Sequence, residues 1–336
     1  IIMPNADTTC ADTAAAAKAA DGLVNSEKVV ALVGALCSSA TISVAENVAI
    51  TAGVTMVSPA STSPAITSIK DQDLLFRTTP SDLYQGSVMA RLLRSKGIDR
   101  IAITYVDNDY GKGFADALAA AFMAAGGKID ANEPHEEGKA DYSEKIRTLA
   151  ASGVDTLVVL AYANGSGQTI IRQAVKSGDF DQFVGGDGMV NDSLIGAIGA
   201  DKLRGMIATR PGVPDTTSAR IFKKLAWADD LNPTATFAAQ SYDAAFLLAL
   251  AIEKNGSAER EGLSKALRAV ATAPGEVVRP GEWQKAKDLL KAGKEINYEG
   301  ATGSLEFDKA GDVSGVIIEL GVYVRFGSFI EFGQIK

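Results

Sequence analysis

The chain has 336 residues, of which 46% are hydrophobic and 22% charged, with a mean hydropathy of +0.08. This composition is typical of a globular protein that buries a large core, and the length favours two lobes. The formal net charge of −8 and the absence of a basic run exclude a nucleic-acid-binding surface. The longest apolar stretch, Ala244–Ile252, is too short to span a bilayer, and Ile1–Asn5 lacks the features of a secretory signal.

Apolar β-branched runs alternate with helical patterns over the first two thirds of the chain, which predicts parallel α/β sheets. Strands are expected at 29–33, 54–57, 100–106, 156–161, 182–185 and 205–209. Helices are expected at 12–26, 42–52, 83–96, 111–125, 142–151, 165–177, 217–231, 237–255 and 259–270. A β-rich tail is expected at 303–307, 316–326 and 329–332, and these late elements are expected to complete the earlier sheets.

Small hydroxyl residues follow two of the predicted strands. Ser38 and Ser39 come after the strand at 29–33, and Ser61 and Thr62 come after the strand at 54–57. Ligands of open α/β sheets bind outside the carboxyl ends of strands, where helix N-termini offer N–H groups to an anion. The pattern predicts a carboxylate site, although helix caps and turn residues have the same composition.

Three further strand ends carry residues that suit a small ligand. Tyr110 and Tyr162 open the segments after two strands, and Asp187 lies in the glycine-rich segment 185–188. The tyrosines offer an aromatic face with a hydroxyl, and the aspartate offers a countercharge for an ammonium group. The alternatives are two packing tyrosines and a solvated aspartate in an Asx turn.

The chain contains two cysteines, Cys10 and Cys37. Cys10 follows a first extended segment and Cys37 ends the next strand, so a parallel sheet would bring them within disulfide reach. Two buried free thiols are the alternative, and spacing alone does not decide between them.

Signatures of catalysis are sparse. The single histidine, His135, lies in the polar segment 132–138, which we interpret as a solvated loop with Glu136 and Glu137 as surface charges. A single histidine in a loop gives little support for serine-histidine catalysis or for a histidine metal site. Neither the P-loop spacing nor a dinucleotide-binding glycine motif is present. We therefore predict a protein that binds a ligand without catalysing a reaction and has no cofactor and no metal. An enzyme acting on small molecules is the alternative.

The order of motifs along nearly the whole chain resembles the leucine/isoleucine/valine-binding proteins of ABC importers. The matching segments are 36–39, 58–64, 76–79, 85–86, 100–103, 109–113, 185–188, 240–244 and 303–308. This resemblance implies the type I periplasmic-binding fold, with two Rossmann-like lobes, parallel sheets and three hinge crossings. It implies one lobe from 1–80 and 211–316 and a second from 81–210 and 317–336.

The resemblance also implies roles for the candidate residues. Ser38 and Thr62 would bind an α-carboxylate, and Ala60 or Ser61 would supply backbone contacts. The ligand-binding residues of the second lobe would be Tyr110, Tyr162 and Asp187, with the aspartate facing an α-ammonium. The two lobes would close over an amino acid.

The family further implies a disulfide between Cys10 and Cys37, a periplasmic location, and delivery of the ligand by a monomer to ABC permease subunits. Family members begin with a strand and helix before the segment that matches Ile1, so we expect an unrecorded upstream piece, because a sheet lacking a central strand exposes its edges. A binding protein for an aromatic or other organic acid, and a ligand-sensing receptor domain, are the alternative functions.

Overall fold

The computed structural model describes residues 2–335 and divides the chain into two compact units. Unit 1 comprises 1–80 and 213–315, and unit 2 comprises 81–212 and 316–336. The chain therefore passes between the units three times, after Pro80, Gly212 and Gly315. The lobe boundaries expected from the sequence lie within two residues of these positions.

Unit 1 contains two small sheets. Three parallel strands, in the order β1-β2-β3, form one of them, and β11-β10-β9 form the other. The strands are β1 (Ala31–Val33), β2 (Thr55–Ser58), β3 (Leu75–Arg77), β9 (Glu276–Val278), β10 (Ile296–Gly300) and β11 (Gly303–Ser304). Every residue of β2 is buried, as expected of a central parallel strand covered on both faces.

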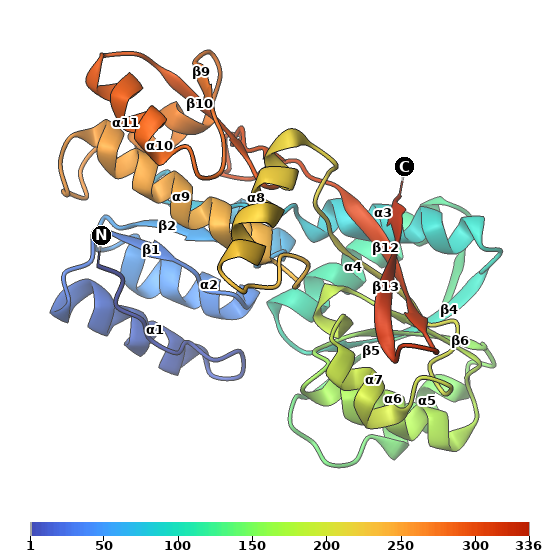
Figure 1. Ribbon diagram of the computed structural model, residues 1–336. Coiled ribbons are helices and arrows are strands. Elements are labelled where there is room, and N and C mark those ends of the chain that lie inside the picture. The colour runs from blue at the N-terminus through green and yellow to red at the C-terminus, as the bar shows by residue number, and fades with distance from the viewer. Residues whose placement is uncertain (1, 336) are drawn as a thin grey trace. The chain divides into compact units, whose positions relative to one another are not determined.

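Helices lie on both sides of the first sheet of unit 1, with α9 and α10 on one side and α1 and α2 on the other (Figure 1). The helices are α1 (Thr13–Asp21), α2 (Ser38–Val44), α8 (Thr217–Ala228), α9 (Ala238–Asn255), α10 (Leu263–Ala271) and α11 (Trp283–Lys291). Helices α1 and α2 continue into π-helical turns, η1 (Gly22–Ser26) and η2 (Ala45–Ala49), and η3 (Pro64–Ser68) is a 3₁₀ helix. Residues 2–9 form no strand, so the expectation that the extended segment before Cys10 is a strand of the parallel sheet is wrong.

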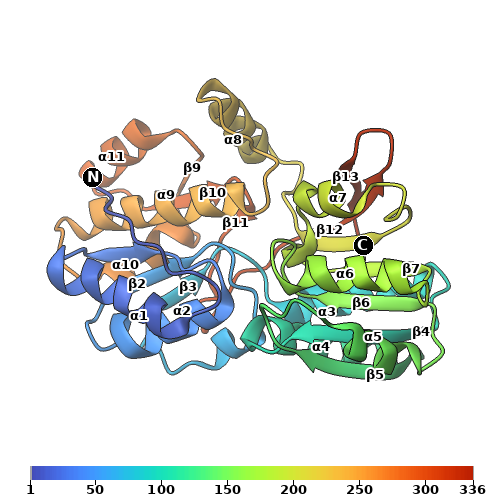
Figure 2. The same ribbon diagram turned by 90° about the horizontal axis from the view of Figure 1, so that it is seen from below.

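Unit 2 is built on a seven-stranded sheet in the order β13-β12-β8-β7-β6-β4-β5. Figure 2 shows β7, β6, β4 and β5 following one another across this sheet. The strands are β4 (Arg100–Val106), β5 (Lys128–His135), β6 (Thr156–Leu160), β7 (Gln182–Gly185), β8 (Ile207–Pro211), β12 (Ile317–Tyr323) and β13 (Ser328–Gln334). Strands β4 to β8 are parallel, whereas β12 pairs antiparallel with both β8 and β13. The tail thus returns to an earlier sheet, as predicted for 316–332.

The helices of unit 2 cover its sheet in two layers, with α3 and α4 on one side and α5, α6 and α7 on the other (Figure 1). Their bounds are α3 (Asp82–Ser95), α4 (Asp109–Ala124), α5 (Ser143–Ala150), α6 (Ser166–Ser177), η4 (Asp187–Met189) and α7 (Asp192–Ile198). Among residues 2–335, no helix is both long and apolar enough to cross a membrane.

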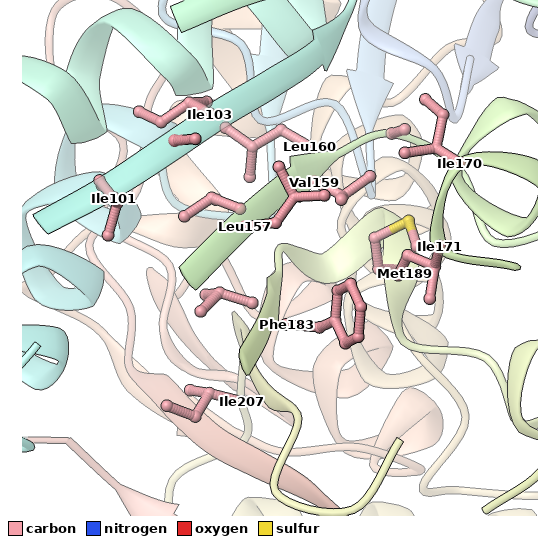
Figure 3. Close-up of a cluster of buried hydrophobic side chains, with 14 of the residues drawn as sticks. Ile101, Ile103, Leu157, Val159, Leu160, Ile170, Ile171, Phe183, Met189 and Ile207 are labelled. Atoms are coloured by element: carbon pink, nitrogen blue, oxygen red, sulfur yellow. The ribbon is translucent and has the colours of Figure 1, made fainter. Parts of the chain in front are cut away.

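The core of unit 2 sits between these layers (Figure 3). Strand β6 is buried along its whole length, and Ile101 and Ile103 of β4 are fully buried. Each such side chain contributes about 1.5 to 3 kcal/mol by leaving water. This packing holds the carboxyl ends of the strands in place, and the candidate ligand residues of unit 2 follow directly from them.

Candidate functional site

The loop after β2 is held by its own polar groups. Ser58 Oγ accepts hydrogen bonds from the N–H groups of Ala60, at 3.5 Å, and Ser61, at 3.1 Å. Ser61 Oγ donates to the Leu36 carbonyl at 2.9 Å and lies 2.7 Å from Thr41 Oγ1. The Ser61 hydroxyl therefore ties this loop to the loop after β1.

Ser38 and Thr62 differ from Ser61 in which hydrogen-bonding groups remain free to contact a ligand. Ser38 is the first residue of α2, and its Oγ accepts from the Ser63 N–H at 3.2 Å. Thr62 is fully buried, and residues 2–335 offer its Oγ1 no hydrogen-bond partner. A buried hydroxyl without a partner costs free energy, so this group is a candidate for a ligand contact. Of the residues predicted in unit 1, Ala60, Ser61 and Thr62 lie in the loop after β2, and Ser38 begins α2 directly after the loop that follows β1.

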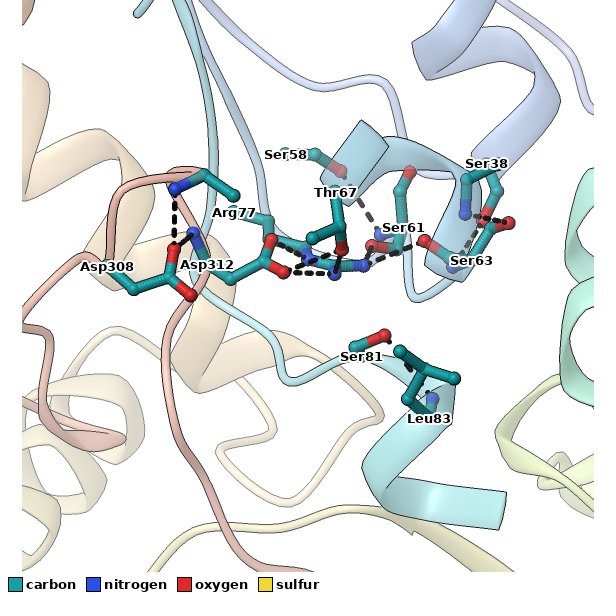
Figure 4. Close-up of polar contacts among 12 residues, drawn as sticks. Ser38, Ser58, Ser61, Ser63, Thr67, Arg77, Ser81, Leu83, Asp308 and Asp312 are labelled. Atoms are coloured by element: carbon teal, nitrogen blue, oxygen red, sulfur yellow. Dashed lines mark hydrogen bonds and ion pairs between the residues drawn. The ribbon is translucent and has the colours of Figure 1, made fainter. Parts of the chain in front are cut away.

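A buried arginine that the sequence analysis did not single out anchors the loop that contains Thr62 (Figure 4). Arg77, at the end of β3, is fully buried and pairs with Asp312 at 2.6 and 2.7 Å. It also donates to the carbonyls of Ser61, at 3.3 Å, and Ser63, at 3.0 Å, and to Thr67. The Ser61–Thr62 peptide is trans, so its N–H points opposite to the carbonyl that faces the guanidinium. Arg77 therefore turns the Thr62 N–H away from itself.

The three candidate residues of unit 2 lie together. Tyr110, in the first turn of α4, donates its hydroxyl to Asp187 Oδ1 at 3.3 Å and accepts from the Gly188 N–H at 3.1 Å. The rings of Tyr110 and Tyr162 stack with centroids 5.4 Å apart. Asn108 donates to the Tyr162 hydroxyl at 3.4 Å. The result is an aromatic wall with a carboxylate at its edge.

Asp187 is buried rather than solvated, with 6% of its surface exposed. Its burial raises its pKa to about 6, and hydrogen bonds from Gln85 and Tyr110 and the charge of Arg210 oppose the rise. Burial likewise raises the pKa values of Tyr162 and Tyr110 well above the usual value of a tyrosine. At neutral pH the site of unit 2 therefore holds an ionised aspartate and two neutral tyrosines.

Gln85 is a second residue that the sequence analysis named only as part of a motif. It lies fully buried on α3 and donates its amide to Asp187 Oδ1 at 3.1 Å. The same nitrogen lies 3.1 Å from the Thr209 carbonyl and 3.2 Å from Thr209 Oγ1. Its oxygen, Oε1, has no partner in the part of the chain that the structure describes.

His135 is not in a solvated loop, and this expectation is wrong. It ends β5, is 4% exposed, and places Nδ1 2.8 Å from Thr104 Oγ1 and Nε2 3.0 Å from Ser166 Oγ. Glu137 accepts from both the N–H and the hydroxyl of Ser166. Burial, with a smaller contribution from Lys145, lowers the pKa of His135 to about 4. These groups hold the start of α6, four residues after Tyr162.

Cys10 and Cys37 form a disulfide, with Cα atoms 5.4 Å apart. The bridge joins the irregular segment before α1 to the residue that precedes α2, and not the ends of two neighbouring strands. Within residues 2–335, no group of three or more histidine, cysteine, aspartate or glutamate side chains is placed to hold a metal ion.

Comparison with known families decides the classification. A family model described as the receptor family ligand binding region matches residues 2–320. A leucine-, isoleucine-, valine-, threonine- and alanine-binding protein of Pseudomonas aeruginosa is 30% identical over 310 residues, covering 91% of this chain and 74% of that protein. The chain belongs to the branched-chain amino acid periplasmic-binding protein family. This confirms the resemblance seen in the sequence.

Solved structures confirm the type I periplasmic-binding fold. The branched-chain amino acid transporter substrate binding protein LivJ of Streptococcus pneumoniae, solved with isoleucine, has a TM-score of 0.74 and 25% identity, covering 95% of this chain and 84% of that one. An ABC transporter solute binding protein from R. palustris, solved with benzoate, has a TM-score of 0.75 and 17% identity, covering 97% and 82%. The chain is thus a type I solute-binding protein, and its similarity to the second structure concerns the fold alone.

Proposed function

We propose that the protein binds an α-amino acid with an apolar side chain. The observation that carries the proposal is the buried carboxylate of Asp187 against the stacked rings of Tyr110 and Tyr162. A buried carboxylate is stabilised by a paired cation that donates hydrogen bonds to it. The two aromatic rings favour an apolar group next to that cation.

The loops of unit 1 supply the complementary chemistry. Thr62 has a buried hydroxyl without a partner, and Arg77 turns its N–H away from the guanidinium. The hydroxyl and the backbone N–H of Thr62 are two donors that suit the two oxygens of a carboxylate. A ligand that satisfies both units therefore carries a carboxylate and an ammonium group, and we propose that Ser38, Ala60, Ser61 and Thr62 hold the first and Asp187 the second, with closure of the two lobes over it.

We infer an extracytoplasmic location and delivery of the ligand to ABC permease subunits. The disulfide between Cys10 and Cys37 supports an oxidising compartment. The relatives are binding proteins, and two of the similar structures are described as parts of transporters. A receptor that senses the ligand would use the same site, so the site does not distinguish transport from sensing. The proposed transport role therefore rests on the family relationship.

Calorimetry with leucine, isoleucine, alanine, benzoate and 4-methylpentanoate tests the ligand class. We expect binding of at least one of the amino acids and much weaker binding of 4-methylpentanoate, which lacks the ammonium. The benzoate complex of a structural neighbour makes an aromatic acid the second candidate. Tight benzoate binding without measurable amino-acid binding overturns the proposal in favour of that candidate, because benzoate brings no cation to Asp187.

A further inference from the structure

We propose that Gln85 is a ligand-binding residue whose Oε1 accepts a hydrogen bond from the ammonium group of the ligand, beside Asp187. This inference rests on the proposed function, and it adds a contact that the sequence did not assign. Its starting point is an amide oxygen that is fully buried and has no partner within residues 2–335.

The orientation of the Gln85 amide follows from its neighbours. The nitrogen faces the Asp187 carboxylate and the Thr209 carbonyl, both at 3.1 Å, and both are acceptors. Exchanging nitrogen and oxygen would set an oxygen against two acceptors. Oε1 is therefore the atom that lacks a partner, and an unsatisfied buried acceptor costs about 1 to 3 kcal/mol.

The distance between Gln85 Oε1 and Asp187 Oδ1 suits an ammonium nitrogen that contacts both oxygens. The oxygen and nitrogen of one amide are about 2.3 Å apart, and Nε2 lies 3.1 Å from Asp187 Oδ1. Oε1 therefore lies no more than about 5.4 Å from that carboxylate oxygen. A nitrogen about 2.8 Å from each of two oxygens bridges separations up to about 5.6 Å.

The surroundings also favour a cation. Asp82 is fully buried one turn before Gln85 on α3, and it adds a smaller contribution to the raised pKa values of Tyr110 and Tyr162, which burial mainly causes. Arg210 is the cation that acts on Asp187 from β8, and it pairs with Glu331 at 2.6 Å. Two acidic side chains, Asp82 and Asp187, therefore act on the same pair of tyrosines, and the arginine that acts on Asp187 is already paired.

The test combines Gln85→Met, which keeps the side-chain length, with Asp187→Asn and two probes, L-leucine and 4-methylpentanoate. We expect Gln85→Met to weaken leucine binding about tenfold or more, because a hydrogen bond to a charged group is lost. Binding of 4-methylpentanoate should change less than about twofold, since this ligand has no ammonium group. Gln284→Met, at an exposed position on α11, is the matched control and should change neither affinity.

The double variant separates direct contact from orientation of Asp187. Direct contact predicts a further loss of leucine affinity when Gln85→Met is added to Asp187→Asn, whereas a role limited to Asp187 predicts none. If Gln85→Met does not fold, the ¹³Cδ resonance of Gln85 in the wild type provides the measurement, and it should shift with leucine but not with 4-methylpentanoate. Leucine binding that Gln85→Met leaves unchanged, or an unmoved resonance, overturns this inference alone. Absence of any amino-acid binding by the wild type overturns the proposed function with it.

Discussion

At the scale of single residues, the burial of Asp187 links ligand binding to pH. Its pKa is raised to about 6 mainly by burial, and only the ionised form is a countercharge for an ammonium group. Amino-acid affinity should therefore be constant above pH 7 and fall by up to tenfold per unit below about pH 6. Calorimetry with leucine between pH 8 and pH 4.5 measures this profile.

Asp187→Asn is the control for that profile. It should lose about 2 to 5 kcal/mol of leucine affinity at pH 7.5, because a buried charge is left without its partner, and the remaining affinity should no longer depend on pH near 6. A wild-type profile that is flat across this range would contradict the role of Asp187.

His135 makes the free energy of unfolding, rather than ligand affinity, depend on pH. Its pKa falls from 6.5 to about 4 in the folded protein, so between these values the unfolded chain takes up a proton that the folded chain does not. Stability should decrease as pH falls from 6.5 to 4, by at most about 3 kcal/mol, and show no further loss from this group below pH 4.

Urea unfolding of the wild type and His135→Gln at pH 7, 6, 5 and 4 isolates this contribution. The variant should be less stable at pH 7, because contacts to Thr104 and Ser166 are altered, and the difference should narrow towards pH 4. A constant difference at all four pH values would show that His135 does not titrate in this range.

Residue chemistry at strand ends could be predicted, but long-range partners could not. Hydroxyls after β1 and β2, and Asp187 after β7, follow from where parallel strands end. Arg77 meets Asp312, which lies 235 residues away in the chain, and Gln85 meets Asp187 across 102 residues. No local pattern encodes such pairs, since they arise only when the elements pack.

At the scale of elements, the contact of Arg77 with the loop after β2 has a measurable consequence. Arg77→Met leaves Asp312, 13% exposed, without its bidentate partner, and should destabilise the protein by about 3 to 5 kcal/mol. Arg220→Met, which breaks an exposed pair with Asp215, is the matched control and should cost less than about 1 kcal/mol. Urea unfolding measures both, and equal effects would contradict the anchoring role.

The disulfide acts on the elements at the start of unit 1. It closes a loop of 27 residues that contains α1, so the double change Cys10→Ser and Cys37→Ser should lower the free energy of unfolding by about 3 to 4 kcal/mol in the chain-entropy model. Differential scanning calorimetry should show a lower melting temperature. Two titratable thiols in the native wild type would refute the bridge itself.

Strand β5 shows why some elements escaped prediction. Its sequence from Lys128 to His135 is mostly polar and contains Pro134, and its burial alternates only over the second half of the strand. As the edge strand of the sheet it has one neighbour, β4, so it needs little apolar surface, and proline is tolerated there. Strands β9 and β10 and helix α11 were missed for the related reason that they are short and partly exposed. Strands β4 and β7 were predicted to the residue, and the seven-residue β4 shows why, because its apolar, β-branched run is unambiguous.

At the scale of the whole molecule, the division of binding groups between two units predicts that ligand changes the conformation of the chain. The loops that we propose to bind the carboxylate belong to unit 1, the proposed ammonium site at Asp187 belongs to unit 2, and three crossings join the units. A ligand that contacts both units stabilises the arrangement in which both contacts exist, and it shifts the population towards that arrangement by its differential affinity.

Small-angle X-ray scattering with saturating leucine measures this shift as a decrease in the radius of gyration. Asp187→Asn at the same leucine concentration is the control, and it should show a smaller decrease because one of the two contacts is weakened. Ligand at a hundredfold excess over its dissociation constant should also add about 2.7 kcal/mol to the stability of the wild type. Strong thermal stabilisation without compaction would mean that one unit alone holds the ligand, and it would contradict closure while leaving amino-acid binding in place.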